Sequence, residues 1–171
     1  MTERSVAHGS FTIERRLGAP PARVFAAWAD PEAKAQWFAA PAEACTELVR
    51  EMNFRVGGQD RLSGKWKESG VTSHFHSYYW DIIPNERIVY AYEMHLDERK
   101  ISVSLATIEF RASGGGTLMT LTEHGAFLDG YDDNHGREHG TRLLVGNMAK
   151  FVDGEGDDPE GWRKIHGPKA T

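Results

Sequence analysis

A segment near the N-terminus, residues 19–38 with the sequence APPARVFAAWADPEAKAQWF, constrains the fold of this chain more than any other. Its proline pair, which begins at Pro20, suits a first helical turn, where the missing N–H is not needed. Behind the prolines, Val24, Phe25 and Trp28 fall on one helical face, which we expect to pack inward. The segment therefore predicts a short amphipathic helix that carries a tryptophan anchor.

A second short helix is predicted directly after the first. Asp30 is a good N-cap residue, and Pro31 after it occupies the first helical position. This helix should carry Trp37 at its end. We interpret Trp28 and Trp37 as anchors that dock the two helices against the rest of the fold, and not as ligand contacts.

Much of the remaining chain alternates between apolar and polar residues, which is typical of half-buried strands. The first such stretch contains Phe11, Ile13 and Leu17 and ends at Gly18. The later stretches are residues 46–66 with a break at Gly57 and Gly58, 71–83, 88–96, 101–110 and 118–124. About six or seven strands with short connections predict an antiparallel meander.

A long C-terminal helix is predicted after the strands. The apolar residues that recur there at helical spacing are Leu144, Met148, Phe151 and Val152. A helix from about residue 132 to 152 would be about 30 Å long, which matches the reach of strands of about eight to ten residues. Gly136, Gly140 and Gly146 would each cost roughly 1 kcal/mol relative to alanine. We therefore expect the first half of this helix to fray, bend or approach another backbone closely.

Composition excludes several classes of function. With 20 basic and 25 acidic residues the net charge is -5, which disfavours nucleic acid as a partner. No apolar run approaches the roughly 20 residues that cross a bilayer, and the first residues do not resemble a secretory signal. The single cysteine, Cys45, fits a reducing compartment, so we expect a cytoplasmic protein. We expect residues 1–152 to form a single domain and residues 153–171 a mobile polar tail on which Trp162 can still dock.

Four segments carry a resemblance to a known family. They are residues 19–38, NFRVGG at 53–58, YWDIIPNERIVYAY at 79–92 and LTEHG at 121–125. Together they resemble the SRPBCC superfamily over about residues 8–152, and most of all its branch similar to the C-terminal domain of activators of the heat-shock-chaperone ATPase. The sequence REHG at 137–140 also matches a turn that is common in relatives, which favours a structural role for it.

The resemblance implies an α+β helix-grip (START-like) fold, in which a curved antiparallel sheet wraps around the long C-terminal helix. In many relatives the space between them holds an apolar or amphipathic molecule, and relatives share no single catalytic triad. The leading hypothesis is therefore a binding protein for a hydrophobic small molecule, without metal or cofactor. The alternatives are a chaperone regulator that acts by protein contact, as in a stress response, and a cyclase or hydrolase with a histidine in the cavity.

Candidate ligand contacts are the aromatic and imidazole side chains on strand faces and the residues that would face them from the helix side, although core packing is the alternative for each one. They are Trp66, His74, His76, Tyr78, Trp80, Tyr90, Tyr92, Phe127, Tyr131, Leu144 and Met148. Tyrosine and tryptophan combine an apolar ring with a polar tip, which suits a mostly apolar pocket with a few hydrogen bonds.

Other polar residues give weaker signals. His74 and His76 have a spacing that allows a shared metal, but nothing fixes a third ligand. His135 and His139 share one side of the last helix, where a solvated surface is the better interpretation.

Two further candidates are limited by their neighbours in the chain. Glu123 and His124 are adjacent on a strand, so at most one of them can enter a cavity as an acid or base. Cys45 has no local base that would activate it as a nucleophile. Exposed strand edges and the tryptophan-rich helices are compatible with a homodimer.

Overall fold

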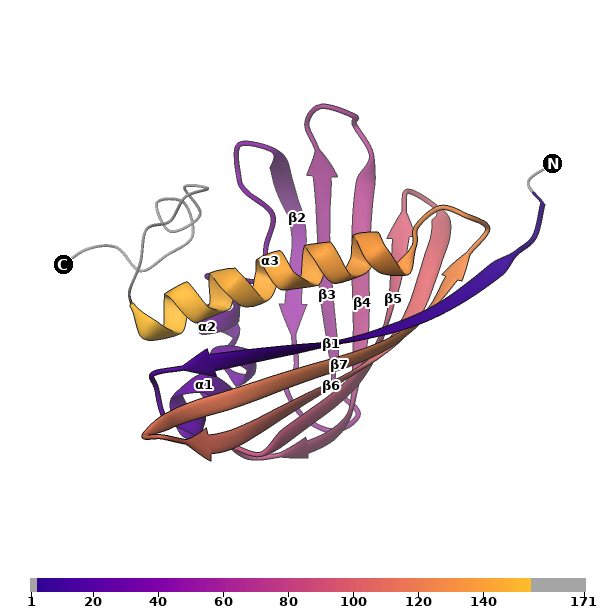
Figure 1. Cartoon of the computed structure of the whole chain (residues 1–171). Helices are drawn as coiled ribbons and strands as arrows, with labels where there is room; N and C mark the ends of the chain where they lie inside the picture. Colours follow the sequence, from indigo (N-terminus) through magenta and orange to yellow (C-terminus); the bar gives the residue numbers. More distant parts are fainter. Residues whose placement is uncertain (1–2, 155–171) are drawn as a thin grey trace.

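The computed structural model describes residues 3–154, which form a strongly curved antiparallel sheet and three helices (Figure 1). The elements in chain order are β1 (Val6–Leu17), α1 (Pro21–Ala29), α2 (Pro31–Ala35), β2 (Cys45–Met52), β3 (Gln59–Trp66), β4 (Thr72–Ile83), β5 (Arg87–Leu96), β6 (Arg99–Ser113), β7 (Gly116–Leu128) and α3 (Asn134–Asp153). This order confirms the predicted α+β fold class. Most of the predicted tail, from residue 155 on and including Trp162, lies outside the described residues.

The sheet has seven strands in the order β1-β7-β6-β5-β4-β3-β2, and all neighbours are antiparallel. Strands β2 to β7 form the predicted meander, and the break predicted at Gly57 and Gly58 separates β2 from β3. The first strand joins the far edge by pairing with the last one, with Leu17 opposite Thr117. The sheet thereby curves around α3, which crosses its concave side (Figure 1).

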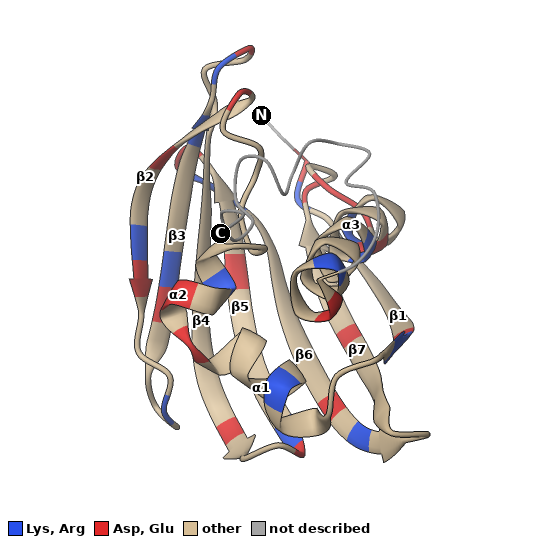
Figure 2. Ribbon diagram, turned by 90° about the vertical axis from the view of Figure 1, so that its left-hand side faces the viewer, with Lys and Arg blue, Asp and Glu red and all other residues tan. Residues whose placement is uncertain are grey.

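The two helices predicted from residues 19–38 are present. Asp30 caps α2 by accepting a hydrogen bond from the Glu32 N–H at 3.0 Å. α2 ends at Ala35, so that Trp37 lies in the following turn. The Trp28 and Trp37 rings meet edge to face at 4.7 Å, and both are buried. The tryptophans thus join the two helices, which occupy the opening between the sheet and α3 at one end of the molecule (Figure 2).

Helix α3 begins and ends with well-formed caps. The Asp133 side chain accepts a hydrogen bond from the Gly136 N–H at 2.7 Å, and Gly154 ends the helix in the left-handed conformation (φ 64°) that glycine adopts without strain. The Gly18 N–H donates to Asp153 Oδ1 at 3.0 Å, which fixes the end of the helix to the turn after β1. Residues 137–140 lie inside this helix and do not form a turn. No helix within residues 3–154 is long and apolar enough to cross a membrane.

Strand β4 shows which sheet face points to the core. Phe75 and Tyr79 are buried, with 9% and 2% of their surface exposed, whereas Trp80 is 65% exposed. Because side chains alternate along a strand, His76 and Tyr78 point away from the face of Phe75 and Tyr79. Trp80 lies at the irregularity in register between Tyr79 and Asp81, and its exposure places it on the same outer face. The concave face of β4 therefore presents a different set of side chains from the one expected for a cavity.

Candidate functional site

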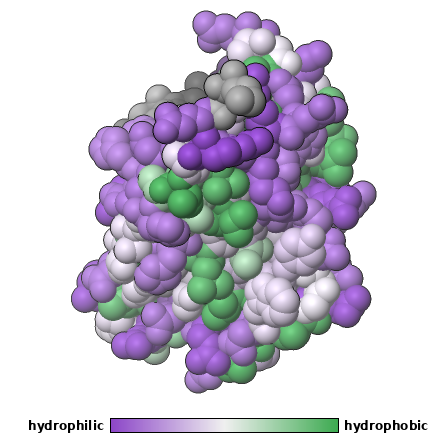
Figure 3. All heavy atoms as spheres, turned by 90° about the vertical axis from the view of Figure 1, so that its right-hand side faces the viewer, coloured by the Kyte–Doolittle hydropathy of each residue, from purple (hydrophilic) through white to green (hydrophobic). Residues whose placement is uncertain are grey.

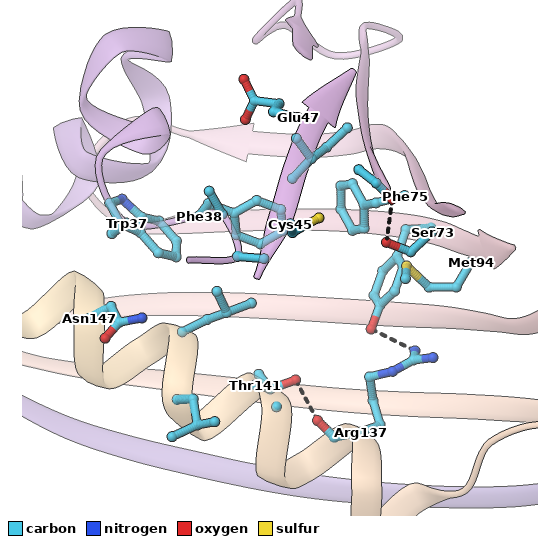
Figure 4. A pocket seen from close by; sticks show the side chains of 18 of the residues that line it. Trp37, Phe38, Cys45, Glu47, Ser73, Phe75, Met94, Arg137, Thr141 and Asn147 are labelled. Carbon is cyan, nitrogen blue, oxygen red and sulfur yellow. Dashed lines mark hydrogen bonds between the residues drawn. The ribbon is translucent and has the colours of Figure 1, made fainter. Parts of the chain in front are cut away.

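A cavity of about 690 Å³ lies between α3, the concave face of the central strands and the loop that follows α2 (Figure 4). Its volume falls within the range of about 300–1,000 Å³ that is typical of small-molecule sites. Aromatic side chains make much of the wall, namely Trp28, Trp37, Phe38, Trp66, Phe75, Tyr90 and Tyr92. The cavity can therefore hold an organic molecule in largely apolar surroundings.

The aromatic wall is held by contacts among its own rings. The Phe75 ring lies 5.1 Å from Phe38 and 4.9 Å from Tyr92, measured between centroids. Trp37 is fixed by a hydrogen bond from Nε1 to the Ala27 carbonyl at 2.9 Å. Since these side chains lock one another in place, the wall keeps its shape without a ligand.

The helix side of the cavity contains two of the predicted glycines, Gly136 and Gly140. A Cβ at position 140 would meet no atom within 4 Å, so the absence of a side chain there leaves open space. Gly146, which also has no atom within 4 Å of such a Cβ, does not line the cavity. α3 is continuous through all three glycines, although each of them lowers helix propensity. A Cβ at position 136 would lie 3.4 Å from the side-chain oxygens of Asp132 and Asp133, so open space is found beside Gly140 and not beside Gly136.

A buried polar cluster closes one end of the cavity. Arg137 donates from Nη1 to Tyr92 Oη at 3.0 Å and from Nη2 to Ser102 Oγ at 2.7 Å and Asp132 Oδ2 at 2.9 Å. Tyr92 donates in turn to Glu123 Oε1 at 2.5 Å, and that oxygen lies 3.9 Å from Arg137 Nη1. Figure 4 shows Arg137 reaching from α3 across to the sheet. The guanidinium thus ties the helix to β5, β6 and β7.

Burial sets the protonation of this cluster. It raises the pKa of the Glu123 carboxyl, and the opposing effects of Tyr92 and Arg137 do not cancel that rise. Burial and the neighbouring Glu123 raise the pKa of Tyr92, so its hydroxyl stays protonated as a donor. The glutamate is the member of the Glu123–His124 pair that faces inward, since Glu123 is 2% exposed and His124 is exposed.

A second buried cluster supports α2 next to the cavity. Lys34 Nζ lies 2.7 Å from Asp60 Oδ2, and Tyr79 donates to the same oxygen at 2.5 Å. Burial lowers the pKa of Lys34, and the carboxylate of Asp60 opposes that shift. Lys34 and Asp60 also border a smaller pocket of about 290 Å³. This cluster fixes the short helix and, through it, the loop that forms one cavity wall.

Four of the predicted contacts line the cavity: Trp66, Tyr90, Tyr92 and Leu144. Phe127 and Met148 are almost completely buried in the protein interior and do not reach the cavity surface. Tyr131 also lies away from the cavity, with the Arg99 guanidinium 5.4 Å from its ring centroid.

The remaining four predicted contacts, His74, His76, Tyr78 and Trp80, do not line the cavity, because they belong to the outer face of β4. His74 Nδ1 lies 2.8 Å from Ser63 Oγ, and His76 Nε2 lies 2.8 Å from Gln59 Oε1. Within residues 3–154, no three histidine, cysteine, aspartate or glutamate side chains are grouped to hold a metal ion.

Sequence reasoning missed several lining residues. Phe75 lines the cavity from β4, on the face opposite to the predicted contacts of that strand. Trp28 and Trp37, predicted only to anchor the two short helices, also line the cavity, as does Phe38 from the same segment. Cys45 lines the cavity as a buried thiol. Arg137 was expected only to have a structural role, and no local pattern indicates that it meets Glu123.

A curved antiparallel sheet that wraps around a C-terminal helix, with a cavity between them, defines a helix-grip domain. A family model described as "Activator of Hsp90 ATPase homolog 1-like protein" matches residues 18–153. The chain belongs to this family within the SRPBCC superfamily, which confirms the resemblance noted in the sequence.

Solved structures agree with this assignment. An uncharacterised protein from Rhizobium leguminosarum is 47% identical with a TM-score of 0.84, and the match covers 90% of this chain and 100% of the other. A protein from Rhizobium loti is 39% identical with a TM-score of 0.78 and coverages of 85% and 97%. An AHSA1-like protein from Aeromonas hydrophila, 18% identical with a TM-score of 0.65 and coverages of 85% and 93%, shows the same fold. Among curated proteins, none matches this chain with significant similarity.

Proposed function

We propose that this protein binds a small, mostly apolar or aromatic molecule in the cavity between α3 and the sheet. The observation that carries the proposal is the open, aromatic-walled space of about 690 Å³, beside which α3 has glycine at position 140.

Binding would be driven by removal of the ligand's apolar surface from water. A ligand that buries about 200 Å² of apolar surface gains about 5 kcal/mol before association entropy is subtracted. Because the rings of Phe38, Phe75 and Tyr92 already pack against one another, binding costs less side-chain entropy than it would in a wall of mobile side chains.

A matched pair of helix variants tests this proposal. Gly140→Leu adds a side chain at a position that lines the cavity, whereas Gly146→Leu adds the same side chain to the same helix at a position that does not line it. In a thermal-shift screen of uncharged aromatic and aliphatic compounds, we expect at least one compound class to raise the melting temperature of the native chain and of Gly146→Leu. Gly140→Leu should fold and lose the shift. A screen without any shift, or equal shifts in both variants, contradicts the proposal.

Regulation of a chaperone ATPase by protein contact is the second candidate, because the description of the family model names such an activator. One surface feature supports a contact role: Trp80, Val103 and Leu105 are exposed by 65%, 44% and 42%. Figure 3 shows hydrophobic side chains gathered on one face of the molecule. The test is ATP turnover by a purified ninety-kilodalton heat-shock chaperone, and an unchanged rate at saturating concentration of this protein excludes the role.

The positions of the histidines do not support the alternative of a cyclase or hydrolase. It requires a histidine in the cavity, and no histidine lines the cavity within the described residues. His74, His76 and His124, the three candidates for a general base, all lie elsewhere.

A further inference from the structure

We propose that the cavity selects an uncharged aromatic compound carrying a hydrogen-bonding oxygen, and that Tyr90 and Asn147 recognise its polar part. This inference rests on the proposed function and specifies the ligand class. It follows from two properties of the described residues. Every charged side chain that lines the cavity is already paired, whereas the accessible polar groups of Tyr90 and Asn147 have no hydrogen-bond partner.

The charged lining residues are paired with one another. Arg50 Nη2 lies 2.6 Å from Glu47 Oε1 and also donates to the Phe38 carbonyl at 2.9 Å. Arg137 is paired with Asp132 at 2.9 Å and with Glu123 at 3.9 Å. An anionic ligand would compete with these carboxylates for guanidinium groups that are already engaged. Exchanging one such pair for another in a partly buried site gives little net gain.

A cationic ligand is disfavoured by the protein's own cations. Aromatic walls attract cations, but the Lys34 ammonium already lies 4.8 Å from the Phe38 ring centroid and 6.0 Å from that of Tyr90. The Arg137 guanidinium lies 5.5 Å from the Tyr92 centroid. Three of the wall rings are thus occupied by positive charge, and a ligand cation on them would meet repulsion. An uncharged aromatic ring meets neither obstacle.

Two polar side chains of the cavity remain without a partner. Tyr90, on β5, and Asn147, on α3, are 6% and 9% exposed, and both line the cavity. Neither side chain has a hydrogen-bond partner among residues 3–154, and neither has an unpaired oxygen or nitrogen that is inaccessible to solvent. Trp28 also lines the cavity, but its unpaired Nε1 is inaccessible and is not available to a ligand. Figure 4 shows the Asn147 side chain extending from α3 on the side that faces the cavity. By contrast, the Thr141 hydroxyl is already bonded to the Arg137 carbonyl at 2.8 Å.

These groups define what a ligand must offer. Burial raises the pKa of Tyr90 well above its usual value, so the group is a neutral hydroxyl that can donate one hydrogen bond and accept another. The Asn147 amide offers both donors and an acceptor. A ketone or phenol oxygen satisfies either group without introducing charge. A pure hydrocarbon would leave both desolvated and unpaired, which weakens its binding.

The test uses four compounds that share a naphthalene ring: 2-acetylnaphthalene, 2-methylnaphthalene, 2-naphthoate and 2-naphthylmethylammonium. Their affinities are measured by displacement of 6-propionyl-2-dimethylaminonaphthalene, an uncharged fluorescent aromatic ketone. We expect acetylnaphthalene to bind about 3- to 10-fold more tightly than methylnaphthalene, as one neutral hydrogen bond provides. Both charged compounds should bind more weakly than acetylnaphthalene by about tenfold or more.

Variants assign the effect to the two residues. Tyr90→Phe and Asn147→Leu should each weaken binding of acetylnaphthalene by about 3- to 10-fold and change binding of methylnaphthalene by less than about twofold. Tyr78→Phe, on the outer face of β4, is the control and should change neither. Unfolding curves of all variants confirm that the fold is retained.

Two kinds of failure are distinguishable. If a charged compound binds most tightly, or if both cavity variants bind acetylnaphthalene as the native chain does, the inference is wrong while the proposed function stands. If neither the fluorescent ketone nor any naphthalene compound binds, the proposed function is contradicted and the inference with it.

Discussion

Replacement of Arg137 by methionine should destabilise the fold in a manner that depends on pH. The guanidinium makes hydrogen bonds to Tyr92, Ser102 and Asp132 and lies 3.9 Å from Glu123. Methionine can fill part of the space, but it leaves the Glu123 carboxylate, 2% exposed, without a cation. Removal of one partner from a buried ion pair costs about 3–5 kcal/mol, and we expect a loss of this size at pH 8.

The loss should shrink as the pH falls. Burial already raises the pKa of Glu123 in the native chain, and removal of a nearby positive charge raises it further. A carboxyl whose pKa is higher in the folded than in the unfolded state binds protons preferentially when folded. Its stabilising effect is fully present below the unfolded pKa and is lost as the pH rises through the folded pKa. Arg137→Met should therefore be about 1–3 kcal/mol less stable at pH 8 than at pH 5.5, with each unit of pKa contributing about 1.4 kcal/mol.

Urea unfolding followed by tryptophan fluorescence at pH 8 and pH 5.5 measures both quantities. The double variant Arg137→Met/Glu123→Gln should lose the added pH dependence and recover part of the stability. Arg142→Met is the control on the same helix, because Arg142 pairs with Glu138 at 3.0 Å on the surface and should cost less than about 1 kcal/mol. A loss at position 137 that equals the control, or one that grows at low pH, would refute the reasoning.

Three further changes test other parts of the structure. Asp60→Asn leaves the buried Lys34 ammonium without its carboxylate, and urea unfolding should show a loss of about 3–5 kcal/mol in the free energy of unfolding. Adding Lys34→Met to the same chain should partly restore it, and an unchanged unfolding midpoint in Asp60→Asn contradicts the assigned pair. Asp133→Ala removes the N-cap of α3 and should cost about 1 kcal/mol in the same assay, whereas no loss would show that the cap is dispensable. Trp80→Ala removes an exposed side chain and should change stability by less than about 0.5 kcal/mol and leave ligand displacement unaltered; weaker binding would mean that the outer face takes part.

The order of elements could be predicted from the sequence because each boundary has a local physical cause. Proline at the start of a helix, the Asp30 cap and paired glycines at turns act within a few residues. Periodicity then separates strands from the long helix. These signals are independent of what the elements pack against, so they were sufficient for the fold.

The choice of strand face could not be made reliably by the same means. On β5, Tyr90 and Tyr92 alternate with Val89, Ala91 and Glu93, and both tyrosines are buried. On β4 both faces carry aromatic residues, with Phe75 and Tyr79 on one and Tyr78 and Trp80 on the other, up to the irregularity in register after Tyr79. Alternation divides such a strand into two sets, but only the neighbouring strands decide which set is buried.

The pairing of the buried charged residues could not be predicted from neighbouring residues in the sequence. Lys34 belongs to a short helix whose only other polar residue, Glu32, is exposed, and its partner Asp60 comes from a different element. Arg137 and Glu123 are likewise brought together only by the crossing of α3 over the sheet. Each residue alone is typical of a protein surface, so the pairing becomes visible only in three dimensions.

The pairing of β1 with β7 also has a consequence for how the chain acquires its structure during synthesis. Strands β2 to β7 can add to one another as successive hairpins while they are made. The residues of β1 must wait for partners about a hundred or more positions later, such as Thr117 for Leu17. We expect β1, which is synthesised before the other strands of this sheet, to be the last to join it, so that a nascent chain that stops before β7 exposes an unpaired β1.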